Sequence, residues 1–289
     1  TRQIPAEVIW MDIDYMDGFR NFTFNPGAFP NPAQLNSDLD AIGFQAVWMA
    51  NCGIKVDGGY DAFQQIDAQG LAVQRSDGSQ YRADVWPGLS VWPDFTMQQT
   101  RDWWAGRIAG FASIGIDGIW NDMNEPADFT GDAYYRPSFT VPDETVAHGN
   151  GSPSSFGRVH NAYATGMNQS TRQAFERFQP ERRGFVLTRA GYAGIQRFAA
   201  VWTGDNHSWW EHLAIQIPMQ LNLSLSGVSF CGADTAGFQL NASPELFARW
   251  VESACLLPFF RAHTALDTLD HEPWSFGEEV LAIARKHIE

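Results

Sequence analysis

The sequence predicts an α/β protein of the (β/α)8 TIM-barrel class, and three observations carry this expectation. Short apolar runs alternate with helix-like segments along the chain, a rhythm typical of parallel strands joined by crossover helices. Most of these runs end in charged or amide side chains, as barrel strands do where they open into a site. The chain has 289 residues, and a barrel of this class needs about 250.

The clearest run covers residues 116–120 and is followed by Asn121, Asp122 and Glu125 before Pro126 stops regular strand pairing. An apolar run that turns abruptly into acids and amides is typical of a buried strand opening into a polar pocket. For an isolated aspartate, a buried strand with an acidic capping turn would be the better interpretation. The recurrence of the pattern along the chain favours a functional site.

Seven runs are predicted to be strands. They begin near Val8, Phe44, Ile116, Gly184, Ala199, Gly227 and Leu256. A closed barrel needs eight strands, so we expect a truncated barrel that lacks its first strand. We expect one domain over residues 1–289, with a long inserted loop region at about 57–95 that contains a hairpin at Asp77-Gly78.

Helix starts are predicted at three places. Thr96 is the expected N-cap of a helix through Trp104, and Ser208 with Glu211 forms the pattern of a capping box. Ser243-Pro244 is the third start, because proline is favoured at the first helical position. The helical pattern that ends the chain has no C-cap, which predicts a longer parent chain.

Composition excludes several classes of partner. The formal net charge is −14 and no basic stretch offsets it, which argues against nucleic acid and anionic membranes. Cys52, Cys231 and Cys255 are widely spaced and odd in number, so they predict neither a disulfide framework nor a zinc motif. The 12 Trp suit stacking on sugar rings, although most of them are expected to fill the packing layers of a barrel.

Charged side chains stand at the ends of six of the predicted strands. They are Asp12, Asp122, Arg189, Asp205, Asp234 and His263. In a barrel the strand ends converge on one mouth. Carboxylates predominate, and no set of His and Cys indicates a transition metal or another cofactor. Two opposed carboxylates with tryptophan nearby are what glycoside hydrolysis requires, but spacing alone does not select which two.

The segment Trp120-Asn121-Asp122-Met123-Asn124-Glu125 resembles the signature of glycoside hydrolase family 31, the α-glucosidase and α-xylosidase family of retaining enzymes. Further segments follow in the family's order: Trp10-Met11-Asp12-Ile13-Asp14-Tyr15-Met16, Trp86-Pro87-Gly88, Leu187-Thr188-Arg189, Phe198 to Asn206, Gly232 to Phe238 and Phe259 to His263. The resemblance covers nearly the whole chain, and its motifs are specific.

The resemblance implies a role for each of these residues. Asp122 would be the nucleophile and Asp205 the acid/base. The hydroxyls of the sugar in the cleaving subsite would be held by Asp12, Arg189, Asp234 and His263. The walls of that subsite would be Ile54, Trp86, Trp120, Met123, Trp202 and Phe238. Arg189 is also expected to lie close enough to a carboxylate to favour an ionised nucleophile.

One departure from the family stands out. Members usually carry Asp-Pro before Gly-Ile, whereas this chain has Asn51-Cys52, so no role is carried over onto Asn51. The family also has a β-sandwich before the barrel and β domains after it. We therefore expect flanking β domains in a longer parent chain.

The resemblance implies a retaining, exo-acting α-glucosidase that hydrolyses terminal α-linked glucose from oligosaccharides through a covalent glycosyl-enzyme. The motif around Asp12 favours the glucosidase branch, while α-xylosidase or α-glucosyl transferase activity is the alternative. A non-catalytic sugar-binding or scaffold protein should have lost one carboxylate, and this chain keeps both. The expected partner is an α-glucoside oligosaccharide, with no metal, cofactor, nucleic acid or membrane. The sequence leaves open a cytoplasmic or secreted localisation.

Overall fold

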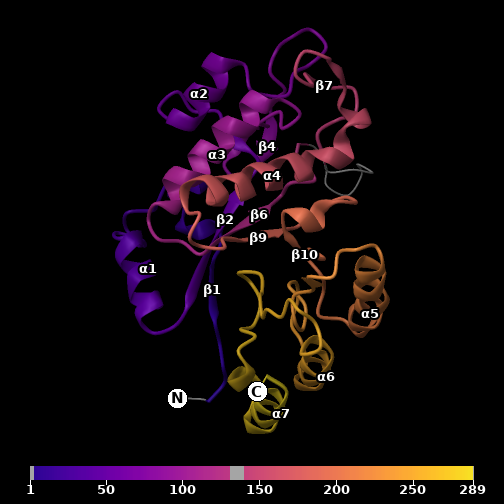
Figure 1. Cartoon of the computed structure of the whole chain (residues 1–289). Coiled ribbons are helices and arrows are strands. Elements are labelled where there is room, and N and C mark those ends of the chain that lie inside the picture. Colours follow the sequence, from indigo (N-terminus) through magenta and orange to yellow (C-terminus); the bar gives the residue numbers. More distant parts are fainter. Residues whose placement is uncertain (1–2, 131–139, 289) are drawn as a thin grey trace. The chain divides into compact units, whose positions relative to one another are not determined.

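The computed structural model describes residues 3–130 and 140–288, and the chain divides into two compact units. The larger unit is Glu7–Ala199, and the smaller comprises Ala200–Glu289 together with Thr1–Ala6. In both units short parallel strands alternate with helices, as Figure 1 shows.

A sheet of parallel strands forms the core of the larger unit. Its order is β1 (Val8–Met11), β2 (Gln45–Asn51), β6 (Gly118–Asp122) and β9 (Phe185–Thr188). Every residue of β6 is buried, and so is every residue of β2 after Gln45. A strand covered on both faces is a nearly continuous apolar run, which is why these strands are recognisable in the sequence.

Helices connect successive strands of this sheet. α1 (Pro32–Ala41) precedes β2, α3 (Gln98–Ala112) precedes β6, and α4 (His160–Phe178) precedes β9. α3 and α4 pack side by side, as Figure 1 shows. The repeated strand–helix–strand order is the one that a parallel sheet requires.

Buried amides and hydroxyls tie α4 to the sheet. Asn121 Nδ2 donates to Asn168 Oδ1 at 2.9 Å, and Asn168 Nδ2 donates to Thr188 Oγ1 at 2.8 Å. Thr171 Oγ1 accepts from Trp104 Nε1 at 2.9 Å, which joins α3 to the same group. Because an unpaired buried polar group is costly, these bonds define how α4 lies against β6 and β9.

The region at about 57–95 has regular structure of its own. It contains α2 (Asp61–Gln69) and the strands β4 (Ala83–Val85) and β5 (Gly88–Val91). These two strands form an antiparallel sheet with β3 (Ile54–Lys55), which lies just before the region, in the order β3-β5-β4. The expected hairpin at Asp77-Gly78 is confirmed. Arg75 N–H donates to Ser79 O at 2.7 Å, and Gly78 has a φ of 84°, in the left-handed region that favours glycine.

Short elements complete the connections of the larger unit. Strands β7 (Val146–Ala147) and β8 (Ser154–Ser155) pair antiparallel, and an isolated bridge joins Val146 to Gln74. The 3₁₀ helices are η1 (Ile13–Tyr15), η2 (Asp17–Phe19), η3 (Phe156–Arg158) and η4 (Ile195–Arg197).

The smaller unit is built around one parallel strand pair. Its elements are β10 (Ala200–Trp202), α5 (Trp210–Leu225), β11 (Cys231–Gly232), α6 (Pro244–Ala254), η5 (Pro273–Phe276) and α7 (Glu278–Ile288). α6 and α7 pack against each other around Trp250, Phe247 and Val280. The predicted start of α6 is confirmed, since Ser243 Oγ accepts from Leu246 N–H at 3.2 Å.

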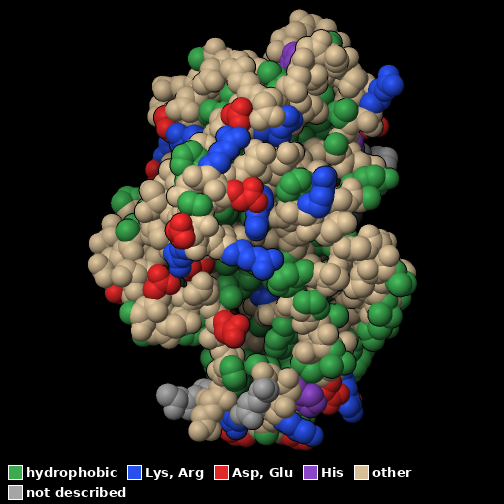
Figure 2. Space-filling model, viewed as in Figure 1, with side chains coloured by type: hydrophobic (Ala, Val, Ile, Leu, Met, Phe, Trp, Pro, Cys, Tyr) green, Lys and Arg blue, Asp and Glu red, His purple; other side chains and the backbone are tan. Residues whose placement is uncertain are grey.

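α5 has an unusual distribution of side chains. Its buried residues are two glutamines, Gln216 and Gln220, and Gln216 Oε1 accepts from Trp250 Nε1 at 3.0 Å. Most of its exposed residues are apolar, and they include Ile215, Ile217, Met219, Leu221 and Leu225. Apolar side chains gather over this helix in Figure 2.

The predicted strand at Leu256 is wrong, and the one at Gly227 begins later than expected. Leu256 and Leu257 continue the end of α6 as turns, with their N–H groups bonded to Ser253 O and Ala254 O. Pro258 then lacks the N–H group that a ladder needs. Among the described residues, one parallel bridge from Asp234 to Arg261 stands in its place. β11 begins at Cys231 because Gly227 closes the turn after α5.

Two of the three predicted helix caps are also wrong. α3 begins at Gln98 after Met97, because Thr96 Oγ1 donates to Asp94 Oδ1 instead of accepting from the helix. α5 begins at Trp210 without a side-chain cap, because Ser208 Oγ donates to Leu240 O at 3.3 Å. In both cases a tertiary partner competes for the hydroxyl that would otherwise cap the helix.

Gly118 offers a test of the β6–β9 pairing. A Cβ on Gly118 would lie 2.7 Å from Phe185 O, so Gly118→Ala should destabilise the protein by about 1–3 kcal/mol. Gly106, exposed on α3 with nothing within 4 Å of an added Cβ, provides the matched control. Gly106→Ala should stabilise by about 0.5–1 kcal/mol, because alanine is the better helix former. Thermal unfolding of both variants measures this, and equal or reversed shifts would contradict the close approach.

Candidate active site

The C-terminal ends of β6 and β9 bring a carboxylate and a guanidinium together. Asp122 is the last residue of β6, and Arg189 follows β9, with its N–H donating to Asn121 O at 3.2 Å. Asn121 pairs with Thr188, so the next residue on each strand points to the opposite face, and that face is the same for both. The Nη1 atom of Arg189 lies 3.3 Å from Asp122 Oδ1.

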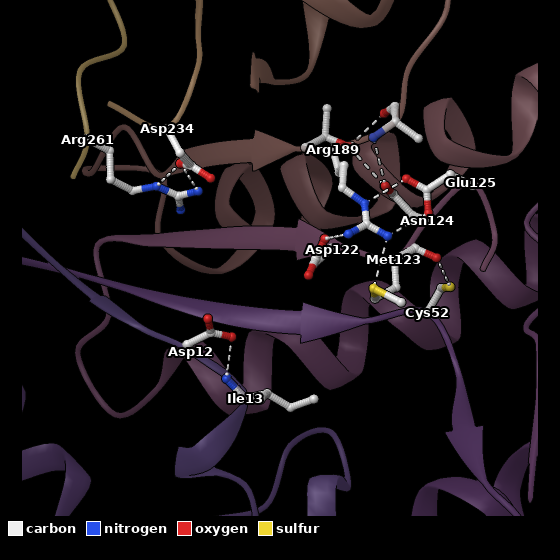
Figure 3. A network of polar contacts seen from close by, with 12 residues as sticks. Asp12, Ile13, Cys52, Asp122, Met123, Asn124, Glu125, Arg189, Asp234 and Arg261 are labelled. Atoms are coloured by element: carbon white, nitrogen blue, oxygen red, sulfur yellow. Dashed lines mark hydrogen bonds and ion pairs between the residues drawn. The ribbon is translucent and has the colours of Figure 1, made fainter. Parts of the chain in front are cut away.

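Arg189 contacts three side chains of one segment, as Figure 3 shows. Its Nε and Nη2 atoms donate to the two carboxylate oxygens of Glu125 at 2.7 and 2.9 Å. Its Nη2 atom also lies 2.9 Å from the Sδ of Met123. The side chains of Arg189 and Asp122 are 15% and 12% exposed, so the pair is largely shielded from water but still reachable. Bidentate pairing fixes the plane of the guanidinium as well as its position.

The β6 loop, residues 122–126, is held by side chains from three other segments. Asn124 Nδ2 donates to Thr188 Oγ1 at 2.9 Å, and Asn124 Oδ1 accepts from Ala190 N–H at 3.0 Å. His160 Nε2 lies 2.8 Å from Glu125 O. Cys52 donates its thiol proton to the carbonyl oxygen of Met123, with 3.0 Å between sulfur and oxygen. These bonds restrain the loop at Met123, Asn124 and Glu125.

Asp12 lies at the end of β1 and caps the 3₁₀ helix that follows. Its Oδ1 atom accepts from Ile13 N–H at 2.6 Å. Trp10, on the same strand, meets Trp120 edge to face with ring centroids 6.1 Å apart. Trp120 is buried, so its ring forms part of the packing between β1 and β6.

The remaining expected wall residues of the larger unit lie on the β3-β5-β4 sheet. Ile54 in β3 is fully buried, whereas Trp86, between β4 and β5, is 49% exposed. Trp86 meets Phe129 edge to face at 5.3 Å, and Phe129 N–H donates to Asp84 O at 2.7 Å. An exposed aromatic pair of this kind offers a flat apolar surface to a ligand.

In the smaller unit, Asp234 is bound by an arginine to which the sequence assigned no role. Arg261 donates from Nε at 3.0 Å and from Nη2 at 2.7 Å to Asp234 Oδ1, and both side chains are almost completely buried (Figure 3). Thr235 N–H donates to Arg261 O at 2.8 Å, so the backbones are paired as well. The guanidinium lies 5.4 Å from the centre of the Trp202 ring. A buried carboxylate needs such a partner.

Asn206 joins the segment of Asp205 to the segment of Phe238. Its Nδ2 atom donates to Asp234 O at 2.9 Å, and its Oδ1 atom accepts from Phe238 N–H at 3.0 Å. Phe238 stacks on His263 with ring centroids 4.9 Å apart. Asp205 is exposed two residues beyond Thr203, whose N–H donates to Gly232 O at 3.1 Å.

His263 is an uncharged imidazole at neutral pH. Burial, aided by the charge of Arg261, lowers the pKa of His263 from 6.5 to about 2. A neutral imidazole has one donor nitrogen and one acceptor nitrogen, which suits a hydroxyl group. Burial also lowers the pKa of His271, which contacts Phe247 and Phe276.

Residues 3–130 and 140–288 contain no group of three or more His, Cys, Asp or Glu side chains placed to hold a metal ion. No helix within these ranges combines the length and apolar character needed to cross a membrane.

Glu125, Asn124, Cys52, His160 and Arg261 were missed as site-forming residues. Asn124, Glu125 and Arg261 lie inside motifs that the sequence singled out, but a motif does not say which member contacts which. The sequence did single out Cys52, because Asn51-Cys52 departs from the pattern that the resemblance implies. His160 had none, because the helix that presents it is distant in sequence from the β6 loop.

The low pKa of His263 predicts acid sensitivity. Below about pH 6.5 the His263 imidazole binds a proton in the unfolded chain but not in the folded chain. The stability that is present above pH 6.5 is therefore lost as the pH falls. His263→Gln should remove this loss and flatten the dependence of the free energy of unfolding on pH between 6.5 and 4.5, by up to about 1.4 kcal/mol per pH unit. Unfolding curves recorded across this pH range measure it. His271→Gln should act in the same direction. Parallel curves for His263→Gln and the parent would contradict a neutral imidazole in the folded protein.

The chain is similar to known proteins over nearly its whole length. Residues 1–289 match the profile of the glycosyl hydrolases family 31 TIM-barrel domain. The chain is 42% identical over 287 residues to α-glucosidase 2 of Bacillus thermoamyloliquefaciens, covering 99% of this chain and 36% of that protein. The structure of an ER glucosidase II heterodimeric complex matches with a TM-score of 0.92 and 35% identity, covering 99% and 31% of the two chains.

A family 31 α-glucosidase from Bacteroides thetaiotaomicron matches with a TM-score of 0.87 and 40% identity, covering 100% of this chain and 46% of that one. The chain spans 36% of the curated Bacillus relative and 31% of the glucosidase II chain, about a third of each. The barrel fold expected from the sequence is confirmed. The chain belongs to glycoside hydrolase family 31, as its TIM-barrel domain.

Proposed function

We propose that this barrel carries the catalytic site of a retaining, exo-acting α-glucosidase that removes terminal α-linked glucose from oligosaccharides. The observation that carries the proposal is the Asp122–Arg189 pair at the ends of β6 and β9. The chain that contains this pair matches the family's barrel domain over residues 1–289. Relatives named α-glucosidase support the substrate class. Because they are much longer than this chain, the activity is proposed for the full-length protein.

Asp122 is the nucleophile in this proposal. Its carboxylate is 12% exposed, and Arg189 holds it from one side, so an ionised oxygen can be presented to a sugar in a fixed direction. Glu125 offsets the charge of Arg189 through two hydrogen bonds and keeps the guanidinium in place. Asp205, which is exposed, is the acid/base.

The reaction proceeds in two displacements. An oxygen of Asp122 bonds to the anomeric carbon while the glycosidic C–O bond breaks, and Asp205 gives its proton to the leaving oxygen. Water then attacks the anomeric carbon of the glycosyl-enzyme. Asp205 takes the proton of that water, and the bond to Asp122 breaks.

The remaining expected residues bind the sugar. Asp12, Arg189, Asp234 and His263 provide charged acceptors, a charged donor and a neutral imidazole, the mixture that several hydroxyls require. Ile54, Trp86, Trp120, Met123, Trp202 and Phe238 provide the apolar walls. The stack of Phe238 on His263 and the two hydrogen bonds from Arg261 to Asp234 Oδ1 support this assignment, because both hold side chains in one orientation.

The stereochemistry of the product tests the mechanism. Two displacements invert the anomeric carbon twice, so the first glucose released from an α-glucoside should be the α anomer. Proton NMR of the fresh product, recorded before mutarotation, checks this. β-Glucose as the first product would refute the double displacement.

The two carboxylates should differ in their kinetics. Asp122→Ala should abolish hydrolysis of every substrate. Asp205→Ala should lose about 10²–10⁴-fold on unactivated oligosaccharides but keep some first-step cleavage of activated aryl glucosides. Azide should then rescue turnover of Asp205→Ala as α-glucosyl azide, because the second step lacks only its base.

Asp102→Ala provides a matched control for this pair. Asp102 is exposed on α3 and pairs with Arg177 on the surface, so its loss should leave rate and melting temperature nearly unchanged. Azide rescue of Asp122→Ala but not of Asp205→Ala would reverse the two roles. If both variants lost melting temperature and activity in parallel, Asp122 and Asp205 would have a structural role only.

A further inference from the structure

Cys52 extends the connection between β2 and β6 beyond the point where their backbone pairing ends. The last paired residues are Asn51 and Asp122. One residue further on, the thiol of Cys52 donates to Met123 O at 3.0 Å, as Figure 3 shows. A side-chain bond thus takes the place of the next backbone bond, directly after the proposed nucleophile.

The segment that carries Cys52 is fixed on its other side by a buried asparagine. Asn21 Oδ1 accepts from Asn51 N–H at 2.8 Å, and Asn21 Nδ2 donates to Asn51 O at 2.8 Å and to Gly53 O at 3.2 Å. Tyr60 Oη donates to Asn21 O at 2.8 Å and holds the asparagine in turn. The thiol is therefore presented from a rigid backbone.

The Cys52 sulfur keeps its proton and acts as a donor. The thiol is fully buried, and burial, followed by the charge of Glu125, raises its pKa far above the ordinary value. A thiolate would repel the carbonyl oxygen, whereas the protonated thiol binds it.

Met123 needs support from outside its own backbone. Its φ is 59°, in the left-handed region that a side chain makes unfavourable. Its carbonyl accepts from Ala127 N–H at 2.8 Å as well as from Cys52, and its Sδ atom touches Arg189, the partner of Asp122. A shift of the Met123 peptide would therefore move Asp122 both through the backbone and through the guanidinium.

We propose that Cys52 is a positioning residue, whose thiol holds the Met123 peptide so that the carboxylate of Asp122 stays aligned with the anomeric carbon. This inference rests on the proposed function of Asp122. Since the nucleophile takes part in both displacements, misalignment should slow the formation and the hydrolysis of the glycosyl-enzyme alike.

The test uses Cys52→Ala, which removes the donor, and Cys52→Ser, which restores one, in the full chain. Cys52→Ala should lower kcat on an aryl α-glucoside about tenfold with little change in KM, and Cys52→Ser should recover most of the loss. Cys255→Ala is the matched control, because Cys255 also donates to a backbone carbonyl, Glu252 O at 3.3 Å, at the end of α6. Its kcat should equal that of the parent.

Hydrogen exchange gives a readout that does not depend on activity. The peptide containing Ala127 should exchange faster in Cys52→Ala than in the parent and return towards the parent rate in Cys52→Ser. An unchanged kcat and exchange rate in Cys52→Ala would overturn the proposal. So would equal losses of kcat and melting temperature in the Ala and Ser variants, which would show a packing role only. A parent protein inactive on α-glycosides would refute the proposed function instead, while the exchange rates would still decide whether Cys52 holds the loop.

Discussion

The candidate site depends on one largely buried guanidinium. Arg189 contacts Asp122, Met123 and Glu125, so the β6 loop is organised around a cation supplied by the next strand. The parallel register of β6 and β9 decides this contact, because it places both residues on one face at one level. A slip of one residue would turn Arg189 to the opposite face and leave two carboxylates without their cation.

A shielded cation paired with a carboxylate is found in each unit. Asp234 and Arg261 are almost wholly buried in the smaller unit, as Asp122 and Arg189 are largely buried in the larger. Burying an ion pair costs desolvation energy that the pairing offsets only with good geometry, so these pairs are poor devices for stability alone. Each pair fixes charges in surroundings from which water is largely excluded, as electrostatic preorganisation requires.

Around these charges the backbone is held by side chains more than by regular pairing. Asn21 clamps the segment after β2, Asn124 bonds to the end of β9, and Asn206 joins two segments of the smaller unit. Amides suit this task because each offers donors and an acceptor to backbone groups that strands leave unpaired where they end. Local irregularity, such as the left-handed Met123, is tolerated where such bonds surround it.

The sequence by itself determined the barrel class and most of the strands, because buried parallel strands are apolar runs whatever their neighbours are. It also predicted that polar groups such as Asp122 and Arg189 would follow these strands, and the structure brings these two together. Their proposed roles came from the family resemblance and stay predictions.

Only the tertiary structure decided the partners. The Asp234–Arg261 and Cys52–Met123 contacts join residues 27 and 71 positions apart, and no local pattern encodes such pairs. The same competition explains the failures at Thr96 and Ser208, whose hydroxyls bond to Asp94 and Leu240 instead of capping helices. Local propensity amounts to about 1 kcal/mol for a cap, so a single tertiary hydrogen bond is enough to override it.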